Sequence, residues 1–132
     1  MTRFFEQLES RRLFSGGLAG GPDPEPIPFD DYEPNNTFTA ATQLGTTNNR
    51  QIYNLTIHQV TGGDKDYFQF TAPSSGPIGV GITFDHFDGN LRLDGYTASG
   101  QATPVWSSNS STFQNGYEGI QIQASAGQTY WI

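Results

Sequence analysis

The sequence contains no cysteine, few charged residues and no long apolar run. Without cysteine, neither a disulfide framework nor a thiolate metal site is possible. Charged residues make up 14% of the chain, whereas soluble domains average roughly 25%. No apolar run approaches the ~20 residues that a membrane-spanning helix needs. The missing cysteines exclude a disulfide-stapled scaffold, and the missing apolar run excludes such a helix within these residues.

Motifs typical of hydrolytic enzymes are also missing. The only two histidines, His58 and His86, do not form the His-Glu-x-x-His zinc motif. A Ser-His-Asp arrangement could be drawn from Ser99, His86 and Asp94, but no Gly-x-Ser-x-Gly turn supports it. We therefore expect a protein that is not an enzyme.

Glycine, proline and aromatic residues are abundant instead. The 132 residues include 16 glycines and 8 prolines, and 14% of them are aromatic. This length suits one domain with one core, and this composition is typical of an all-β extracellular module with many turns. A small exported domain without disulfides needs another stabilising device, and a bound metal ion is one option.

The charge is distributed unevenly along the chain. Net charge is −7, with +1 on the first 12 residues and −8 on residues 13–132. An acidic body repels the phosphate backbone, so nucleic acid is not an expected partner.

The N-terminal region divides into two segments. Residues 1–15 place apolar side chains at rough helical spacing, and residues 16–30 form a glycine- and proline-rich linker. Residues 8–15 resemble a surface-export segment of the Leu-Glu-Pro-Arg type, with Ser10 where proline is commonest and Phe14 in place of a leucine. The resemblance implies a secreted or cell-surface protein. A frayed amphipathic N-terminus is the alternative.

Alternating apolar and polar residues predict strands through the body, residues 31–132. The expected strands are 51–58, 66–72, 78–84, 90–97, 102–107, 117–124 and 129–132. Short strands at this spacing favour an antiparallel β-sandwich. A single helical turn is expected within 36–45, capped by Asn36 or Thr37. The chain stops at Ile132 within a predicted strand, which leaves an expected unpaired edge and a strand that reads as truncated.

The alternation also assigns residues to faces. Tyr53, Leu55 and Ile57 are expected to share one face of the strand 51–58. Gly79 and Gly81 form one face of the strand 78–84, which predicts the close approach of another backbone or a ligand.

Two oxygen-rich segments, 31–37 and 63–68, precede strands that could pack together. In an extended chain, Asp31, Glu33 and Asn35 point to one side, and Asp64 and Asp66 likewise share a side. Two facing rows of carboxylates would repel one another unless a cation lay between them, and Ca²⁺ prefers such oxygen ligands. Solvated turn residues explain the same composition, so both interpretations stay open at this point.

The body resembles the bacterial pre-peptidase C-terminal domain. The matching stretches are Glu33 to Thr37, the alanine pair at 40–41, Gly63 to Phe70, and the apolar stretches 78–84, 91–93 and 126–131. The resemblance implies a jelly-roll-like sandwich of about eight strands that is non-catalytic and is attached to secreted proteases or large surface proteins. Arg92 departs from the family, because many members have aspartate there, and the family's last strand is missing after Ile132.

The resemblance also implies a calcium site. Its ligands would be Asp31, Glu33, Asn35, Asn36, Asp64 and Asp66. No other cofactor is expected.

Aromatic side chains are the other candidate contacts. Trp106, Tyr96 and Tyr117 could present flat faces to a polysaccharide or a matrix protein, although core packing would also explain them. Trp106 is expected to share a strand with Val105. The alternatives to an accessory module are therefore a binding module of this kind and a truncated piece of a secreted peptidase.

Overall fold

The computed structural model describes residues 2–8, 29–57, 64–84, 90–109 and 116–132, with the backbone alone for 2–8. These residues form nine strands: β1 (Thr2–Leu8), β2 (Thr42–Thr46), β3 (Gln51–Leu55), β4 (Phe68–Thr71), β5 (Gly76–Thr83), β6 (Leu93–Gly95), β7 (Trp106–Ser108), β8 (Tyr117–Ala124) and β9 (Thr129–Trp131). No membrane-spanning helix is found in this part of the chain.

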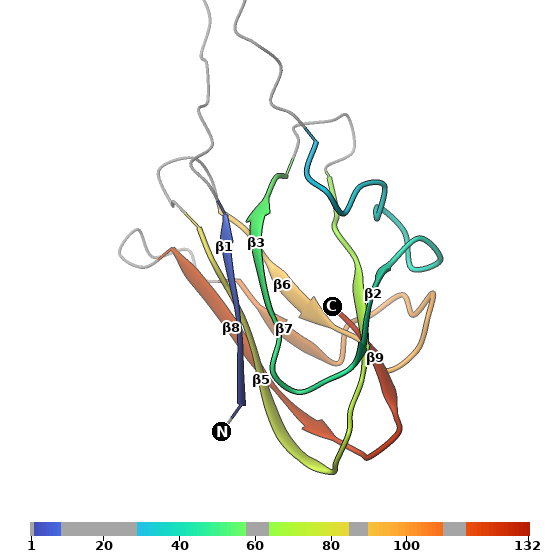
Figure 1. Cartoon of the computed structure of the whole chain (residues 1–132). Helices are drawn as coiled ribbons and strands as arrows, with labels where there is room; N and C mark the ends of the chain where they lie inside the picture. The colour runs from blue at the N-terminus through green and yellow to red at the C-terminus, as the bar shows by residue number, and fades with distance from the viewer. Residues whose placement is uncertain (1, 9–28, 58–63, 85–89, 110–115) are drawn as a thin grey trace, which may run out of the picture.

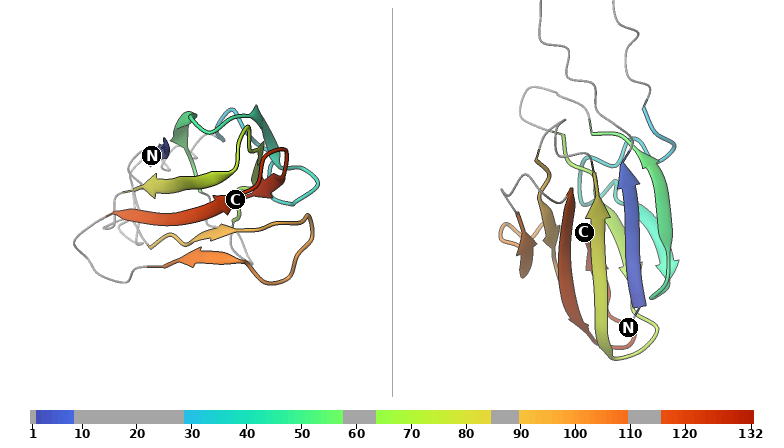
Figure 2. Two further views of the ribbon diagram at one scale, coloured as in Figure 1. Left: turned by 90° about the horizontal axis from the view of Figure 1, so that it is seen from below. Right: turned by 90° about the vertical axis from the view of Figure 1, so that its left-hand side faces the viewer.

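The strands form a sandwich-like all-β structure (Figures 1 and 2). A four-stranded sheet has the order β3-β1-β5-β8, a three-stranded sheet has the order β2-β4-β9, and β6 pairs with β7. The pairs β4–β9, β5–β8 and β6–β7 are antiparallel, whereas β1 runs parallel to both its neighbours and β2 runs parallel to β4. The predicted all-β class is confirmed. The jelly-roll winding stays a prediction.

The core is built by the period-2 pattern of the apolar strands. Phe68, Phe70 and Ala72 are buried on one face of β4 and the residue after it, as the sequence predicted. Ile78, Val80 and Ile82 in β5 are buried in the same cluster, together with Ile120, Ile122 and Ala124 of β8. Alternation puts these side chains on one face of each strand, and their burial holds the two larger sheets together.

The shared face expected for Tyr53, Leu55 and Ile57 is wrong, because Tyr53 and Leu55 lie on opposite faces of β3. Ile52 and Leu55 are buried, whereas Tyr53 is 51% exposed. The cause is Asn54, whose φ of 60° lies in the left-handed region. At this point the register between β1 and β3 slips by one residue, so Leu55 returns to the face of Ile52.

In place of a helical turn within 36–45, the structure has a hydrogen-bonded turn at 37–40, and strand β2 follows it. The Ala40 amide donates to the Thr37 carbonyl at 3.0 Å and to the Thr37 hydroxyl at 3.2 Å. Thr37 therefore caps this turn, and the chain then enters β2. Leu44 in β2 is buried, whereas Ala40, which precedes β2, is exposed.

The two ends of the chain also differ from expectation. The helical pattern predicted over 1–15 is wrong for Thr2–Leu8, which form β1, because pairing with β3 and β5 outweighs local helical spacing. The export role of this segment stays a prediction. At the other end, the Ile132 amide donates to the Phe68 carbonyl at 2.9 Å, and Trp131 bridges to Tyr96. The end of the chain was expected to leave an unpaired strand edge, and this expectation is wrong. The last two residues are hydrogen-bonded on both sides, Ile132 to Phe68 and Trp131 to Tyr96.

The predicted strand 102–107 begins later, at Trp106. Val105 precedes β7 and is 50% exposed. The close approach expected at the glycine face is made by Tyr117, since a Cβ added to Gly81 would lie 2.7 Å from its ring. A side chain of the same protein, rather than a ligand, covers this glycine.

We predict that Asn54→Gly preserves stability and that Asn54→Val lowers it by about 1–2 kcal/mol, because a β-branched residue is strained at this positive φ. The urea unfolding midpoint of each variant measures this. Equal midpoints for the two variants would contradict the left-handed conformation. Tyr53→Val, at an exposed β3 position, is the control for introducing valine into this strand.

Candidate metal site

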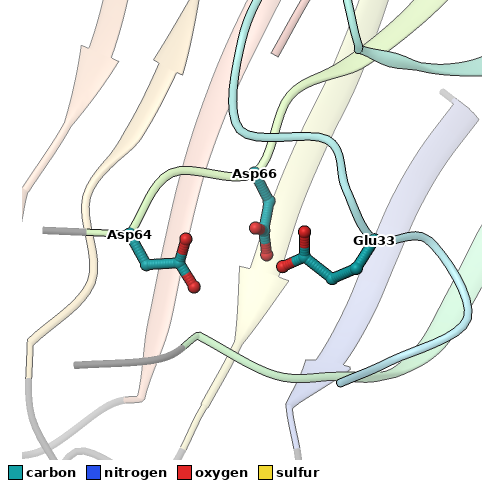
Figure 3. A group of neighbouring side chains, drawn as sticks. All are labelled: Glu33, Asp64 and Asp66. Atoms are coloured by element: carbon teal, nitrogen blue, oxygen red, sulfur yellow. The ribbon is translucent and has the colours of Figure 1, made fainter. Parts of the chain in front are cut away.

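Three carboxylates from the two oxygen-rich segments meet at one end of the fold. Glu33 precedes β2, and Asp64 and Asp66 precede β4. One carboxylate oxygen from each residue lies within 4.8 Å of the others. Figure 3 shows the three side chains turned toward a common space. The facing clusters expected from the sequence are therefore brought together.

Backbone and amide contacts hold the two segments against each other. The Tyr67 amide donates to the Asn35 carbonyl at 3.0 Å. With its amide nitrogen turned toward the second segment, Asn36 donates to Asp64 Oδ1 at 2.8 Å and to the Lys65 carbonyl at 3.0 Å. The meeting of the carboxylates thus follows from the pairing of the chain on either side of them.

Asp30, the last residue of the predicted linker, anchors the first segment. Its Oδ1 accepts the Tyr32 amide at 2.8 Å, and its Oδ2 accepts the Thr56 amide at 2.8 Å. Tyr32 packs edge-on against Phe68, with ring centroids 5.8 Å apart. Aspartate is common at the start of turns because its side chain can accept a hydrogen bond from the amide two residues later. The residue type could therefore have indicated a turn at Asp30 from the sequence.

A local turn positions Glu33. Its Oε2 accepts the Asn35 amide at 3.2 Å, across Pro34. Its other oxygen, Oε1, is buried and has no hydrogen-bond partner within the described ranges of the chain. This oxygen is therefore free to bind a ligand.

Asn35 gives the clearest sign of missing contacts. The residue is 0% exposed, and neither Oδ1 nor Nδ2 has a hydrogen-bond partner among the residues that the structure describes. A buried amide left in this way costs about 1–3 kcal/mol. Its backbone binds both Glu33 and Tyr67, so an additional group bound beside these segments would relieve that cost.

The charges of the cluster also favour a bound cation. Glu33, Asp64 and Asp66 are all half-buried. Two carboxylates at 4.8 Å repel each other by about 3 kcal/mol at an effective dielectric constant of about 20. The donors are oxygens, with no histidine or cysteine in the group, and hard cations such as Ca²⁺ prefer such a set.

The six expected ligands lie in three different environments. Glu33, Asp64 and Asp66 converge, and Asn35 is buried beside them. Asn36 joins the two segments through its amide. Asp31 is exposed and lies outside the group of carboxylates, because the turn that begins at Asp30 interrupts the extended alternation on which its assignment rested.

The aromatic candidates have different environments. Tyr96 is 9% exposed and packs edge-on against Phe38, so most of its ring is in contact with the protein, and a ligand-contact role for it stays a prediction. Trp106 is half-buried and packs against Tyr130, with ring centroids 6.1 Å apart. Tyr117 alone of the three is well exposed, at 45%.

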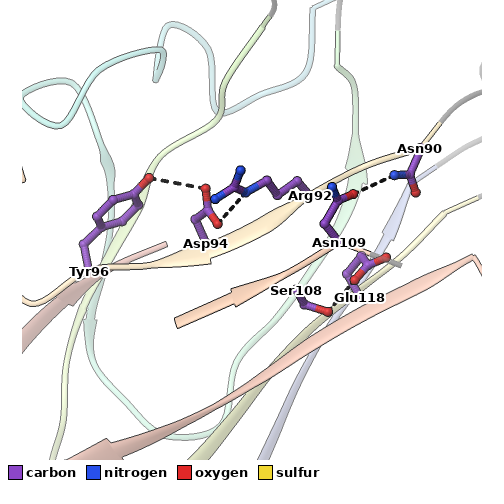
Figure 4. A network of polar contacts seen from close by, with 7 residues as sticks. All are labelled: Asn90, Arg92, Asp94, Tyr96, Ser108, Asn109 and Glu118. Carbon is purple, nitrogen blue, oxygen red and sulfur yellow. Dashed lines mark hydrogen bonds and ion pairs between the residues drawn. The ribbon is translucent and has the colours of Figure 1, made fainter. Parts of the chain in front are cut away.

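A cavity of about 430 Å³ adjoins the carboxylate cluster. Asp64 and Asp66 line one side of it, and Arg92, Asp94 and Tyr96 line another. Figure 4 shows Arg92 Nε donating to Asp94 Oδ1 at 2.8 Å and the Tyr96 hydroxyl donating to Asp94 Oδ2 at 3.5 Å. Arg92, the residue that departs from the family pattern, therefore forms an ion pair with Asp94 in this wall of the cavity.

Asp94 influences the titration of both neighbours. The hydrogen bond to Asp94 raises the pKa of Arg92. Burial is the main cause that raises the pKa of Tyr96, followed by the negative charge of Asp94. Tyr96 therefore favours its neutral form in the folded protein.

Comparisons with models of protein families, with curated proteins and with solved structures find no match for this chain. The class that the fold and the site define is an all-β sandwich-like domain with an oxygen-only acidic cluster.

The raised pKa of Tyr96 predicts a loss of stability in alkali. Below the unfolded pKa of about 10 both states are protonated, so the stabilising contribution is complete. As pH rises above this value, the unfolded tyrosine ionises first and stability falls until the folded pKa is passed. Urea midpoints between about pH 8 and 11.5 should fall less for Tyr96→Phe than for the wild type. Tyr53→Phe, at an exposed tyrosine, serves as the control, and equal slopes for all three proteins would contradict the prediction.

Proposed function

We propose that this chain is a non-catalytic, calcium-stabilised accessory module of a secreted or cell-surface protein. The observation that carries the proposal is the half-buried group of Glu33, Asp64 and Asp66, next to Asn35, whose buried amide lacks hydrogen-bond partners. Ca²⁺ takes 6–8 oxygen ligands, and carboxylates, amide oxygens, backbone carbonyls and water can all supply them. The proposed ligands are Glu33, Asn35, Asp64 and Asp66.

Calcium would act on the fold by joining two segments that repel each other without it. One segment follows the linker, and the other leads directly into β4 through Tyr67. Because the unfolded chain cannot hold the three carboxylates together, the ion would bind the folded state alone and stabilise it by mass action. The ion would also fix where the linker leaves the domain, and hence how the module is held relative to its partner or surface.

The absence of cysteine supports the need for such a device, because a small exported domain has no disulfide to use here. The acidic body, the glycine- and proline-rich linker and the resemblance to pre-peptidase C-terminal domains support an extracellular location. A linked catalytic domain or an extracellular polymer is the proposed partner.

Thermal unfolding tests the calcium site. At free Ca²⁺ about 100-fold above its Kd, the wild type should gain about 2.7 kcal/mol over the chelated protein. Glu33→Gln should lose most of this gain and should be more stable than the wild type in chelator, because one of the repelling charges is removed.

Asp31→Asn is the matched control, since it removes the same charge from an exposed neighbour outside the cluster. It should keep the calcium response. Equal melting temperatures with calcium and with chelator for the wild type would refute the proposal, as would equal calcium responses in Glu33→Gln and the wild type.

Tyr117 favours a second candidate function, the binding of an extracellular polysaccharide. Its ring lies over Gly81 and Gly119, which face each other across β5 and β8. The ring is thus supported by backbone while 45% of the residue stays exposed. Aromatic side chains held in this way provide apolar faces with a polar tip.

Tyr117→Ala should reduce retention on insoluble polysaccharides by at least about fivefold, equivalent to about 1 kcal/mol. Val105→Ala, at another exposed apolar residue, should leave retention unchanged. Co-sedimentation measures both variants. Full retention by Tyr117→Ala would remove this candidate and leave the calcium proposal unaffected.

A further inference from the structure

The N-terminal strand occupies an interior position of the larger sheet. Residues Thr2 to Gln7 of β1 pair with Ile78 to Thr83 of β5, and Phe5 to Leu8 pair with the β3 residues between Gln51 and Leu55. Figures 1 and 2 show β1 lying between these two strands. Among the described strands, β3 has no other neighbour in the sheet, and β1 alone joins it to β5 and β8.

The strand β1 is remote in sequence from both its neighbours. The twenty residues 9–28 separate it from the next part of the chain that the structure describes. Both sides of this connection lie at the same end of β3, because Leu8 pairs with Leu55 and Asp30 accepts the Thr56 amide. The sheet therefore holds β1 through pairing rather than through a short turn.

Without β1, the sheet would have a slot with two open edges. β3 and β5 would each present unpaired backbone N–H and C=O groups, which bind an added strand readily. Buried Ile52 and Ile82 lie on the core side of this slot, on either side of the β1 position at Glu6. An occupant thus gains backbone pairing on both sides, and it closes the sheet over the core.

We propose that the space between β3 and β5 is a strand-acceptor site, and that β1 of a second copy of this chain can fill it. The second copy carries the same seven residues and can form the same parallel register, so the exchanged contacts equal those within one chain. The difference in free energy then comes from the connection. Covalent attachment gives a chain's own strand an effective concentration, of order millimolar for linked binding modules, and the second copy competes against it.

Peptide binding to the full-length chain tests the acceptor site. Glu6→Pro places proline at the middle of β1, opposite Ile52 and Ile82, where it removes a backbone donor and disrupts pairing. A fluorescent peptide of residues 1–12 should bind this variant saturably and should bind the wild type at least tenfold more weakly, because the wild-type slot is filled. Fluorescence anisotropy measures the binding.

Matched controls distinguish strand pairing from nonspecific binding of the peptide. Ser10→Pro introduces the same residue outside β1 and should bind the peptide as weakly as the wild type. A peptide that itself carries Glu6→Pro should not bind. A folded Glu6→Pro chain that fails to bind the wild-type peptide would overturn the acceptor site.

The wild type supplies a test that does not depend on the variant. Amide hydrogen exchange in β3 should be slowed by at least 100-fold relative to an unstructured peptide, and exchange at the unstructured rate would overturn the pairing. Analytical ultracentrifugation at concentrations approaching millimolar should show a reciprocal dimer for the wild type and none for Glu6→Pro. Peptide binding without a wild-type dimer would overturn the assignment of a second copy. Because Glu33, Asp64 and Asp66 form the carboxylate cluster and none of them belongs to β1, neither test changes a proposed calcium ligand.

Discussion

The repulsion between carboxylates held close together is the constraint on which this end of the structure depends. Glu33 approaches Asp64 and Asp66 because the Asn35 carbonyl binds the Tyr67 amide and because Asn36 reaches across to the second segment. These contacts have to overcome a repulsion of about 3 kcal/mol per pair of charges. Either the hydrogen bonds alone meet this cost or a cation shares it, and the partnerless amide of Asn35 favours the cation.

The same contacts connect the site to the core. Tyr67 leads directly into β4, where Phe68 and Phe70 are buried. Tyr32, two residues after Asp30, packs against Phe68. A change in the carboxylate cluster would therefore alter how well the first segment packs on the hydrophobic cluster, and this coupling explains why a bound ion would register in global stability rather than only at the surface.

The larger sheet shows a second dependence, on pairing between segments far apart in sequence. Its central strands β5 and β8 are antiparallel and carry the regular apolar alternation. The strand β3 joins them only through β1, so the two halves of the sheet are held by a strand from the chain's first residues. Such a strand obtains its stability from its neighbours, and a local helical pattern in its sequence gives no indication of them.

Most of the core could be predicted from alternation, because burial on one face of a strand leaves a direct record in the residue order. The alternation failed at β3, where Asn54 adopts a positive φ and shifts Leu55 to the face of Ile52. It also failed to locate Asp31, since the turn begun by Asp30 changes the direction of the following residues. Local backbone geometry of this kind depends on contacts with Thr56, which is distant in sequence.

The residue order by itself determined the all-β class, the buried faces of β4, β5 and β8, and the two acidic segments that precede β2 and β4. It did so because side-chain direction in an extended chain follows position alone. Only the tertiary structure decided which carboxylates converge, which aromatic rings stay exposed and which strand fills the space between β3 and β5. These outcomes depend on pairing between remote segments, and the free energy of that pairing is not recorded in any local pattern.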